Sequence, residues 1–213
     1  MSKYSEKRVA FFGDSITESR VDGRFGWPGR IGQMLSLKES VNYGIGGASV
    51  STCRGQNRVI HQIEDHVYTY DAIFLHGGVN GAWESAPAGI MTETAPDQTD
   101  LEALDQDTFG GALEYLLAKA KELFPASRIG YIINPRLVTP IGRMSDMREY
   151  VDLTLAICKK WGIDTINLYD NDELNAALHF ETTEFAADGI HPNAAGYDLI
   201  APVIAPFVAA HLD

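Results

Sequence analysis

The sequence predicts an α/β protein built on a mostly parallel, five-stranded sheet of the doubly wound kind. Short apolar runs rich in β-branched residues recur along the chain, as expected of strands buried on both faces of a sheet. Longer amphipathic segments separate these runs, and this alternation favours parallel strands joined by right-handed crossovers. The predicted strands cover residues 9–12, 40–43, 72–75, 128–133 and 164–167.

The first two helices are predicted from apolar spacing and from the residues that begin and end helices. One starts near Pro28 and is expected to turn three apolar side chains inward, those of Ile31, Met34 and Leu35. The clearest helix covers residues 109–124, where apolar residues recur at spacings of three and four. Thr108 precedes it as a capping residue and Pro125 ends it.

Two further helices are predicted towards the end of the chain. One covers about residues 147–161, and Gly162 is placed to take the left-handed conformation just past its end. Residues 193–212 also have helical periodicity but contain Pro202 and Pro206. Because each proline removes a backbone donor, we expect this last helix to be kinked or broken.

Residues 84–107 interrupt the alternation of strands and helices. They contain prolines, a glycine and seven acidic residues, and they have no sustained apolar face. A long surface loop or lid is therefore predicted there, inside a single domain that covers residues 1–213. A chain of this length can bury one sizeable core but is short for two ordinary domains.

Composition narrows the classes of function. The formal net charge of −12 disfavours binding to nucleic acid or to an anionic membrane, and favours small uncharged or cationic substrates. Cys53 and Cys158 lie far apart without a CxxC pattern, so neither a disulfide framework nor a thiolate zinc site is predicted. The apolar run at 9–12 is too short for a secretion signal, so we expect a cytoplasmic protein. A homo-oligomer is compatible with this composition.

Four stretches of small and polar residues suggest where the chemistry lies. Three lie at the ends of predicted strands, and the fourth lies between the last predicted strand and the last helix. In a doubly wound sheet the carboxyl ends of the strands form the ligand-binding edge, so the stretches are expected to converge. They read GDSIT (13–17), NYGIGG (42–47), GGVN (77–80) and DGIHP (188–192).

Acyl transfer by a serine is the chemistry that needs such a set. A serine hydroxyl is a weak nucleophile that requires a base, usually a histidine held in the right tautomer by a third group. Ser15, His191 and Asp188 fit these roles, because Asp188 can fold back onto Nδ1 and leave Nε2 facing the serine. The N–H groups of Ser15 and Gly47 and the amide of Asn80 are candidate donors to an oxyanion. No histidine spacing predicts a metal site.

Each of these residues also has a structural interpretation. Ser15 and Glu18 match the S-x-x-E capping box that begins many helices, and Asp14 could itself be the cap. Asn80 could be a turn residue, and His191 could merely precede a helix. The glycine-rich stretch does not complete GxGxxG, so a dinucleotide site is weakly indicated. Catalysis is favoured because all four stretches occur together and in the same order along the chain. Asp14, next to the serine, is expected to be a supporting residue of the site.

With these stretches the chain resembles the SGNH, or GDSL-type, hydrolase family, in which sequence blocks supply Ser, Gly, Asn and His. Residues 13–17 match its first block, Gly47 its second, residues 77–80 its third and residues 188–191 its fifth. The resemblance implies a three-layer α/β/α, flavodoxin-like fold and a Ser-His-Asp site without metal or organic cofactor. It also implies ester hydrolysis through an acyl-enzyme, with an oxyanion hole formed by Ser15, Gly47 and Asn80.

The chain departs from the family pattern at two positions. Ile16 stands where leucine is usual, which should leave the chemistry intact. The third block normally reads GxND, but Gly81 follows Asn80 here, and the missing aspartate is expected to loosen the turn that aims Asn80.

Two hypotheses from different classes follow, together with a weaker third. The first is a serine esterase acting on small, short-acyl esters, for example acetylated carbohydrates. The second is a non-catalytic, flavodoxin-like module that binds small molecules with a degraded site, and the third is a nucleotide binder. Trp27 and Trp83 could form a stacking wall for a sugar ring or could equally be core residues.

Overall fold

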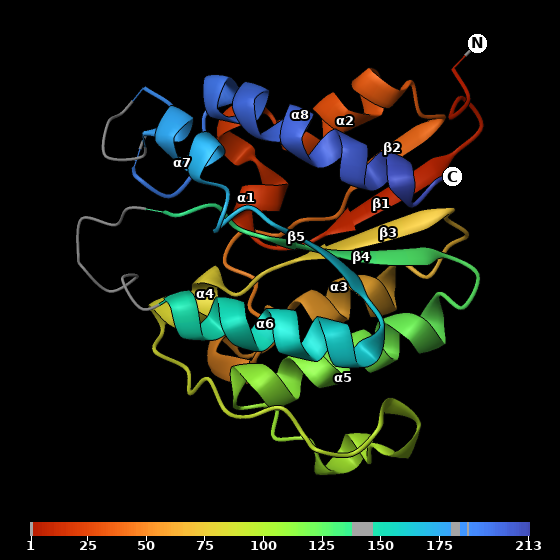
Figure 1. The fold of residues 1–213 in the computed structure, drawn as a ribbon, viewed down its shortest axis with the longest axis vertical. Coiled ribbons are helices and arrows are strands. Elements are labelled where there is room, and N and C mark those ends of the chain that lie inside the picture. The colour runs from red at the N-terminus through yellow and green to blue at the C-terminus, as the bar shows by residue number, and fades with distance from the viewer. Residues whose placement is uncertain (1, 138–146, 180–183, 187) are drawn as a thin grey trace.

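A computed structural model of the chain describes residues 2–137, 147–179, 184–186 and 188–213 (Figure 1). Within these residues, five parallel strands form one sheet in the order β2-β1-β3-β4-β5. The predicted fold class is confirmed, and each predicted strand agrees with the structure to within one residue at either end. The strands are β1 (Arg8–Phe12), β2 (Glu39–Asn42), β3 (Ala72–His76), β4 (Arg128–Ile133) and β5 (Asp164–Asn167).

Helices cover both faces of the sheet and give three α/β/α layers (Figure 1). One face carries α3 (Val59–Asp65), α5 (Phe109–Leu123) and α6 (Met147–Trp161). The other face carries α2 (Gly26–Leu35), α7 (Asp172–Leu178) and α8 (Ala194–Ala210). Two short helices, α1 (Ser15–Glu18) and α4 (Val79–Trp83), begin shortly after β1 and β3 end.

The core consists of two apolar layers, one on each face of the sheet. Neighbouring residues of β1 alternate between them, since Phe12 joins the layer under α3 and α5 whereas Phe11 joins the layer under α2 and α8. Phe11 packs edge-on against Trp27, with ring centroids 5.0 Å apart. Trp27 is only 1% exposed, so the interpretation of this residue as part of a sugar-stacking wall is wrong. Burial on both faces explains why the strands read as continuous apolar runs.

The structure corrects two predictions about helices. Helix α8 is not broken at Pro202 or Pro206, which both face solvent, so water can hydrate the carbonyls that lose an N–H partner. The buried face of α8 packs on the sheet and holds the helix together. Met34, predicted to point inward, is 51% exposed. The buried stripe of α2 runs through Trp27 and Ile31, four residues apart, and Met34 lies off it.

Residues 84–107 form neither α-helix nor strand but include two short 3-10 turns, Pro96–Gln98 and Leu101–Ala103. The segment is tied to α5 and α6 by the buried carboxylate of Glu114. Thr92 donates to Glu114 through its N–H (2.8 Å) and its hydroxyl (3.1 Å), and the indole of Trp161 donates at 3.0 Å. Lys160 forms an ion pair with the same carboxylate. These contacts place the middle of the segment against the outer helices.

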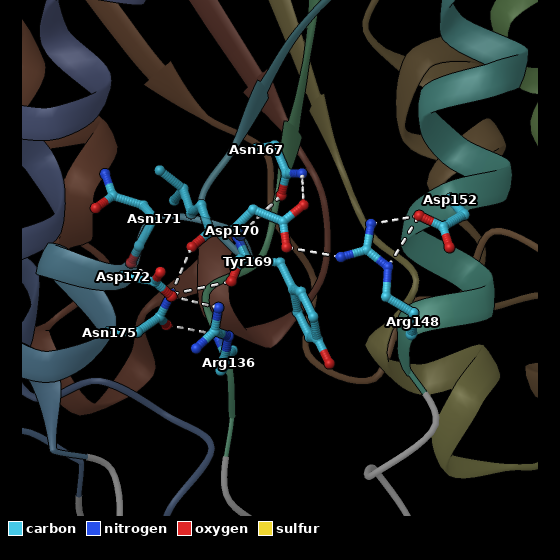
Figure 2. A network of polar contacts seen from close by, with 10 residues as sticks. Arg136, Arg148, Asp152, Asn167, Tyr169, Asp170, Asn171, Asp172 and Asn175 are labelled. Carbon is cyan, nitrogen blue, oxygen red and sulfur yellow. Dashed lines mark hydrogen bonds and ion pairs between the residues drawn. The ribbon is translucent and has the colours of Figure 1, made fainter.

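A second polar network lies beyond the carboxyl ends of β4 and β5 (Figure 2). Arg148 contacts Asp170 at 2.6 Å and also Asp152, while Arg136 contacts Asp172 at 2.6 Å. Both guanidinium groups also lie near the ring of Tyr169, at 5.7 Å for Arg136 and 5.5 Å for Arg148. The network fixes the connection between β5 and α7.

The strand register brings the predicted site stretches to one edge of the sheet. Phe12, the last residue of β1, pairs with Leu75, and Phe11 pairs with Asn42, the last residue of β2. The segments that follow β1, β2 and β3 therefore all leave from this carboxyl edge, as expected for a parallel sheet.

Candidate active site

Ser15 is the first residue of α1, directly after the turn that ends β1. The helix cap is Asp14, whose carboxylate accepts a hydrogen bond from the N–H of Ile16 at 2.9 Å. The Ser15 hydroxyl is therefore not used for capping. At Gly13 a Cβ would lie 2.4 Å from the Thr17 hydroxyl and 2.9 Å from the carbonyl oxygen of His76, so only glycine fits at this turn.

Two buried side chains hold this turn from opposite layers of the molecule. On α3, the amide of Gln62 accepts from the N–H of Gly13 at 2.9 Å and donates to its carbonyl at 2.8 Å. On α8, the hydroxyl of Tyr197 donates to the carbonyl of Ile16 at 2.8 Å. Neither residue was predicted from the sequence. A glutamine on a short helix gives no local signal that its amide reaches a turn 49 residues away.

His191 and Asp188 meet Ser15 across the carboxyl edge. The Nε2 atom of His191 lies 2.8 Å from the Ser15 Oγ, and its Nδ1 lies 2.6 Å from Oδ2 of Asp188. The neutral imidazole that fits these contacts donates from Nδ1 to the carboxylate and accepts at Nε2 from the serine hydroxyl. Gly189 takes a positive φ of 77°, the left-handed conformation that lets the intervening chain fold back.

Asp188 is held as a carboxylate by the turn that carries it. Its Oδ1 accepts from the N–H groups of His191 (2.8 Å) and Ile190 (3.0 Å). Burial raises the pKa of Asp188, but these N–H groups and the His191 ring lower it by more, so that the pKa lies below its usual range. At neutral pH the side chain facing His191 Nδ1 is therefore a charged acceptor.

The glycine-rich stretch after β2 and the start of α4 supply hydrogen-bond donors near Ser15. Gly47 has a φ of 77°, and among the described residues neither its N–H nor that of Ser15 has a hydrogen-bond partner. Asn80 uses one amide hydrogen to donate to the carbonyl of Ala48 at 2.9 Å, which leaves the second hydrogen free. This bond fixes Asn80 to the Gly47 stretch without help from residue 81.

Beneath Ser15 lies a buried polar layer that the sequence did not predict. The ring of His76, at the end of β3, is 2% exposed. Its Nδ1 lies 2.9 Å from the Thr17 hydroxyl and 3.5 Å from Asp14 Oδ1, and its Nε2 lies 2.6 Å from Asn134 Oδ1. The structure places His76 in the core, in contact with the residues that flank the serine.

A cavity of about 300 Å³ opens beside Ser15 and His191. Its wall includes the apolar side chain of Val21, which is 56% exposed. The lining residues are Ser15, Glu18, Arg20, Val21, Gly46 and His191. Across the described part of the chain, no cluster of three or more His, Cys, Asp or Glu side chains could hold a metal ion. Nor does any helix in these ranges have the length and apolar character needed to cross a membrane.

The sequence profile of the GDSL-like lipase/acylhydrolase family matches residues 11–199. The chain belongs to this family. The match spans all four stretches from which the site was predicted. A search of curated proteins finds no match.

Solved structures share the same fold at low sequence identity. A protein from Lactobacillus plantarum is 22% identical, with a TM-score of 0.81 over 97% of this chain and 98% of that chain. A GDSL-like protein from Bacteroides uniformis is 23% identical, with a TM-score of 0.71 over 96% of both chains. A variant of an acetyl-xylooligosaccharide esterase from Geobacillus is 22% identical, with a TM-score of 0.59 over 97% and 95% of the two chains. These likenesses establish the α/β/α fold of the family.

Proposed function

We propose that this GDSL-family chain is a serine esterase in which Ser15 is the nucleophile, His191 the general base and Asp188 the residue that orients the histidine. One observation carries the proposal. The two contacts of His191, 2.8 Å to the Ser15 Oγ and 2.6 Å to Asp188, form the relay that serine acyl transfer requires. Three residues from two distant parts of the chain meet in the order that this chemistry uses.

The reaction runs in two steps. The Ser15 Oγ attacks the ester carbonyl carbon while its proton passes to His191 Nε2, and Asp188 stabilises the resulting imidazolium. The tetrahedral intermediate collapses when its C–O bond breaks, and His191 returns the proton to the leaving alcohol. A water molecule then attacks the acyl-enzyme with the same base, which releases the carboxylic acid and restores the Ser15 hydroxyl.

The oxyanion of both tetrahedral intermediates needs donors that are already in place. We assign these to the N–H groups of Ser15 and Gly47 and to the free amide hydrogen of Asn80. Two features support the assignment: the N–H groups lack partners among the described residues, and Asn80 is anchored to Ala48. The positive end of α1 adds to the stabilisation, because Ser15 lies at its N-terminus. Asp14 supports the site by capping α1, which leaves the serine hydroxyl available.

The substrates that fit best are esters of short acyl chains, and acetylated carbohydrates are a suitable class. The cavity of about 300 Å³ beside Ser15 is at the small end of ligand sites. One protein with the same fold is an acetyl-xylooligosaccharide esterase.

The test compares wild type and Ser15→Ala on p-nitrophenyl esters of increasing acyl length, beside acetylated oligosaccharides. We expect the highest kcat/KM on acetyl esters and a loss of about a thousandfold or more in kcat for Ser15→Ala. Unchanged hydrolysis by Ser15→Ala would refute the assignment of the nucleophile. A preference for acyl chains of eight carbons or more would refute the short-acyl specificity.

A further inference from the structure

Arg20 lies on the wall of the candidate active-site cavity, in the short 3-10 turn Arg20–Asp22 that follows α1. Its guanidinium carbon is 4.0 Å from the position that a Cβ would occupy on Gly46, the residue before Gly47. The side chain is 76% exposed, so a molecule in the cavity can reach it. Arg20 therefore stands next to the stretch to which we assign an oxyanion donor.

A buried carboxylate fixes the direction of this guanidinium. Glu18 is only 2% exposed, and its Oε1 contacts Arg20 Nε at 2.9 Å and Arg24 Nη1 at 2.5 Å. Arg24 also donates from Nη2 to the carbonyl of Gly44 at 3.1 Å. Among the described residues, by contrast, the two Nη atoms of Arg20 have no partner. Arg20 is held by its inner nitrogen and presents an unused pair of donors.

The cluster of Glu18, Arg20 and Arg24 carries a net charge of +1, and this favours an anion beside Arg20, the guanidinium of the cluster that lines the cavity. The other nearby carboxylate, Asp188, already accepts hydrogen bonds from His191 and from two N–H groups. The net charge of −12 suggested uncharged or cationic substrates, but that field comes from charges spread over the whole molecule. Salt screens such distant charges over about 8 Å at physiological ionic strength, whereas a contact with Arg20 is screened much less.

We propose that Arg20 is a specificity-determining residue that binds a carboxylate carried by the ester substrate. The planar fork of a guanidinium matches the two oxygens of a carboxylate, which makes arginine the preferred residue for such contacts. This proposal rests on the proposed esterase function. The carboxylate can belong to the alcohol part or to the acyl part of the ester, and the experiment separates the two.

The experiment uses two pairs of esters, and in each pair one member carries a free carboxylate that a methyl group masks in the other. The alcohol-side pair is 4-acetoxybenzoate and its methyl ester, and the acyl-side pair is monophenyl succinate and its methyl ester. The readout is the ratio of kcat/KM for the charged ester to that for its neutral partner. This ratio does not depend on the fraction of folded enzyme, so a loss of stability in a variant does not affect it.

We expect Arg20→Gln to lower the ratio of at least one pair about two- to fivefold, the range for an ion pair at an exposed site. Arg20→Lys should retain part of the preference, because the charge remains while the fork is lost. The matched control is Arg128→Gln, which removes an equal charge from an exposed residue at the opposite end of the sheet. We expect it to leave both ratios unchanged.

Three results would overturn the proposal. Equal ratios in wild type and Arg20→Gln for both pairs would show that Arg20 does not read the charge. An equal fall in the ratio for Arg128→Gln would assign the effect to the overall field of the protein. No turnover of any of the four esters would refute the esterase function itself and, with it, the role of Arg20.

Discussion

Replacing Gln62 with leucine tests how the molecule holds its candidate nucleophile. Gln62 is 1% exposed, and its amide forms two hydrogen bonds with the backbone of Gly13. Leucine has a similar size, so the change removes these bonds without opening a large cavity. The carbonyl of Gly13 keeps a second donor, the N–H of Ile45 at 3.0 Å, but its N–H is left without a partner.

The expected loss of stability follows from the hydrogen bonds that Gln62→Leu removes. A buried donor without a partner costs about 1–3 kcal/mol, and the lost bond to the carbonyl adds about 0.5–1.5 kcal/mol. We therefore expect Gln62→Leu to lower the free energy of unfolding by about 1.5–4.5 kcal/mol. We also expect kcat to fall with little change in KM, because Gln62 does not line the cavity but positions the turn that carries Ser15.

The assay combines urea unfolding, followed by circular dichroism, with steady-state kinetics on p-nitrophenyl acetate. The matched control is Gln33→Leu, which changes an exposed glutamine on α2 and should alter stability by less than about 0.5 kcal/mol. The reasoning is refuted if Gln62→Leu unfolds at the same urea concentration as Gln33→Leu and keeps the kcat of wild type.

Three further predictions follow from the contacts above. Asp188→Asn should lower kcat about 10³- to 10⁴-fold, because an amide no longer holds the imidazole in the productive tautomer. Steady-state kinetics on p-nitrophenyl acetate measure the loss, and a kcat equal to that of wild type would contradict the role of Asp188. Glu114→Gln should cost about 3 kcal/mol at neutral pH, because the half-buried ammonium of Lys160 keeps its hydrogen bonds to Thr92 but loses its counter-charge. Burial raises the pKa of Glu114, but its hydrogen bonds, first of all the one from Lys160, lower the pKa by more. The ionised carboxylate of Glu114 therefore stabilises the fold at neutral pH, and this contribution is lost as the pH falls through the lowered pKa. The stability difference between wild type and Glu114→Gln should then narrow in acid, and a pH-independent difference in urea unfolding would contradict this. In the native protein a maleimide should label Cys53 and leave Cys158 unreacted, because burial raises the pKa of the Cys158 thiol to about 12. Labelled Cys158 in peptide mass spectra would refute this prediction.

The strands could be predicted from the sequence because both faces of the sheet are buried. A buried parallel strand is apolar along its whole length, and the run at 128–133 needs no tertiary information to be recognised. The short helices α3, α4 and α7 were not predicted, because five to seven residues give too few apolar positions for a helical period. In α8, packing of the buried face outweighs the effect of two prolines that face solvent.

At the site, the sequence could identify the candidate catalytic residues, because this set of residue types seldom occurs together in this order. It could not identify the residues that hold them in position. Ser15, Asp188 and His191 stand in short stretches with a recognisable spacing, and the structure brings them within hydrogen-bond distance. Gln62 and His76 act through contacts with backbone or buried polar atoms, which depend on the packing of distant elements. The capping interpretation of Ser15 is wrong for a local reason, since Asp14 provides the cap one residue earlier.

The most direct test of the central claim is covalent labelling of Ser15. A fluorophosphonate reacts with a serine hydroxyl only where a neighbouring base activates it, and the adduct is located by intact-protein and peptide mass spectrometry. The account predicts a single adduct on Ser15 in wild type, none in Ser15→Ala and a strongly slowed reaction in His191→Ala. No adduct on the wild-type protein, as a non-catalytic binding module would give, or an adduct on another residue, would contradict it.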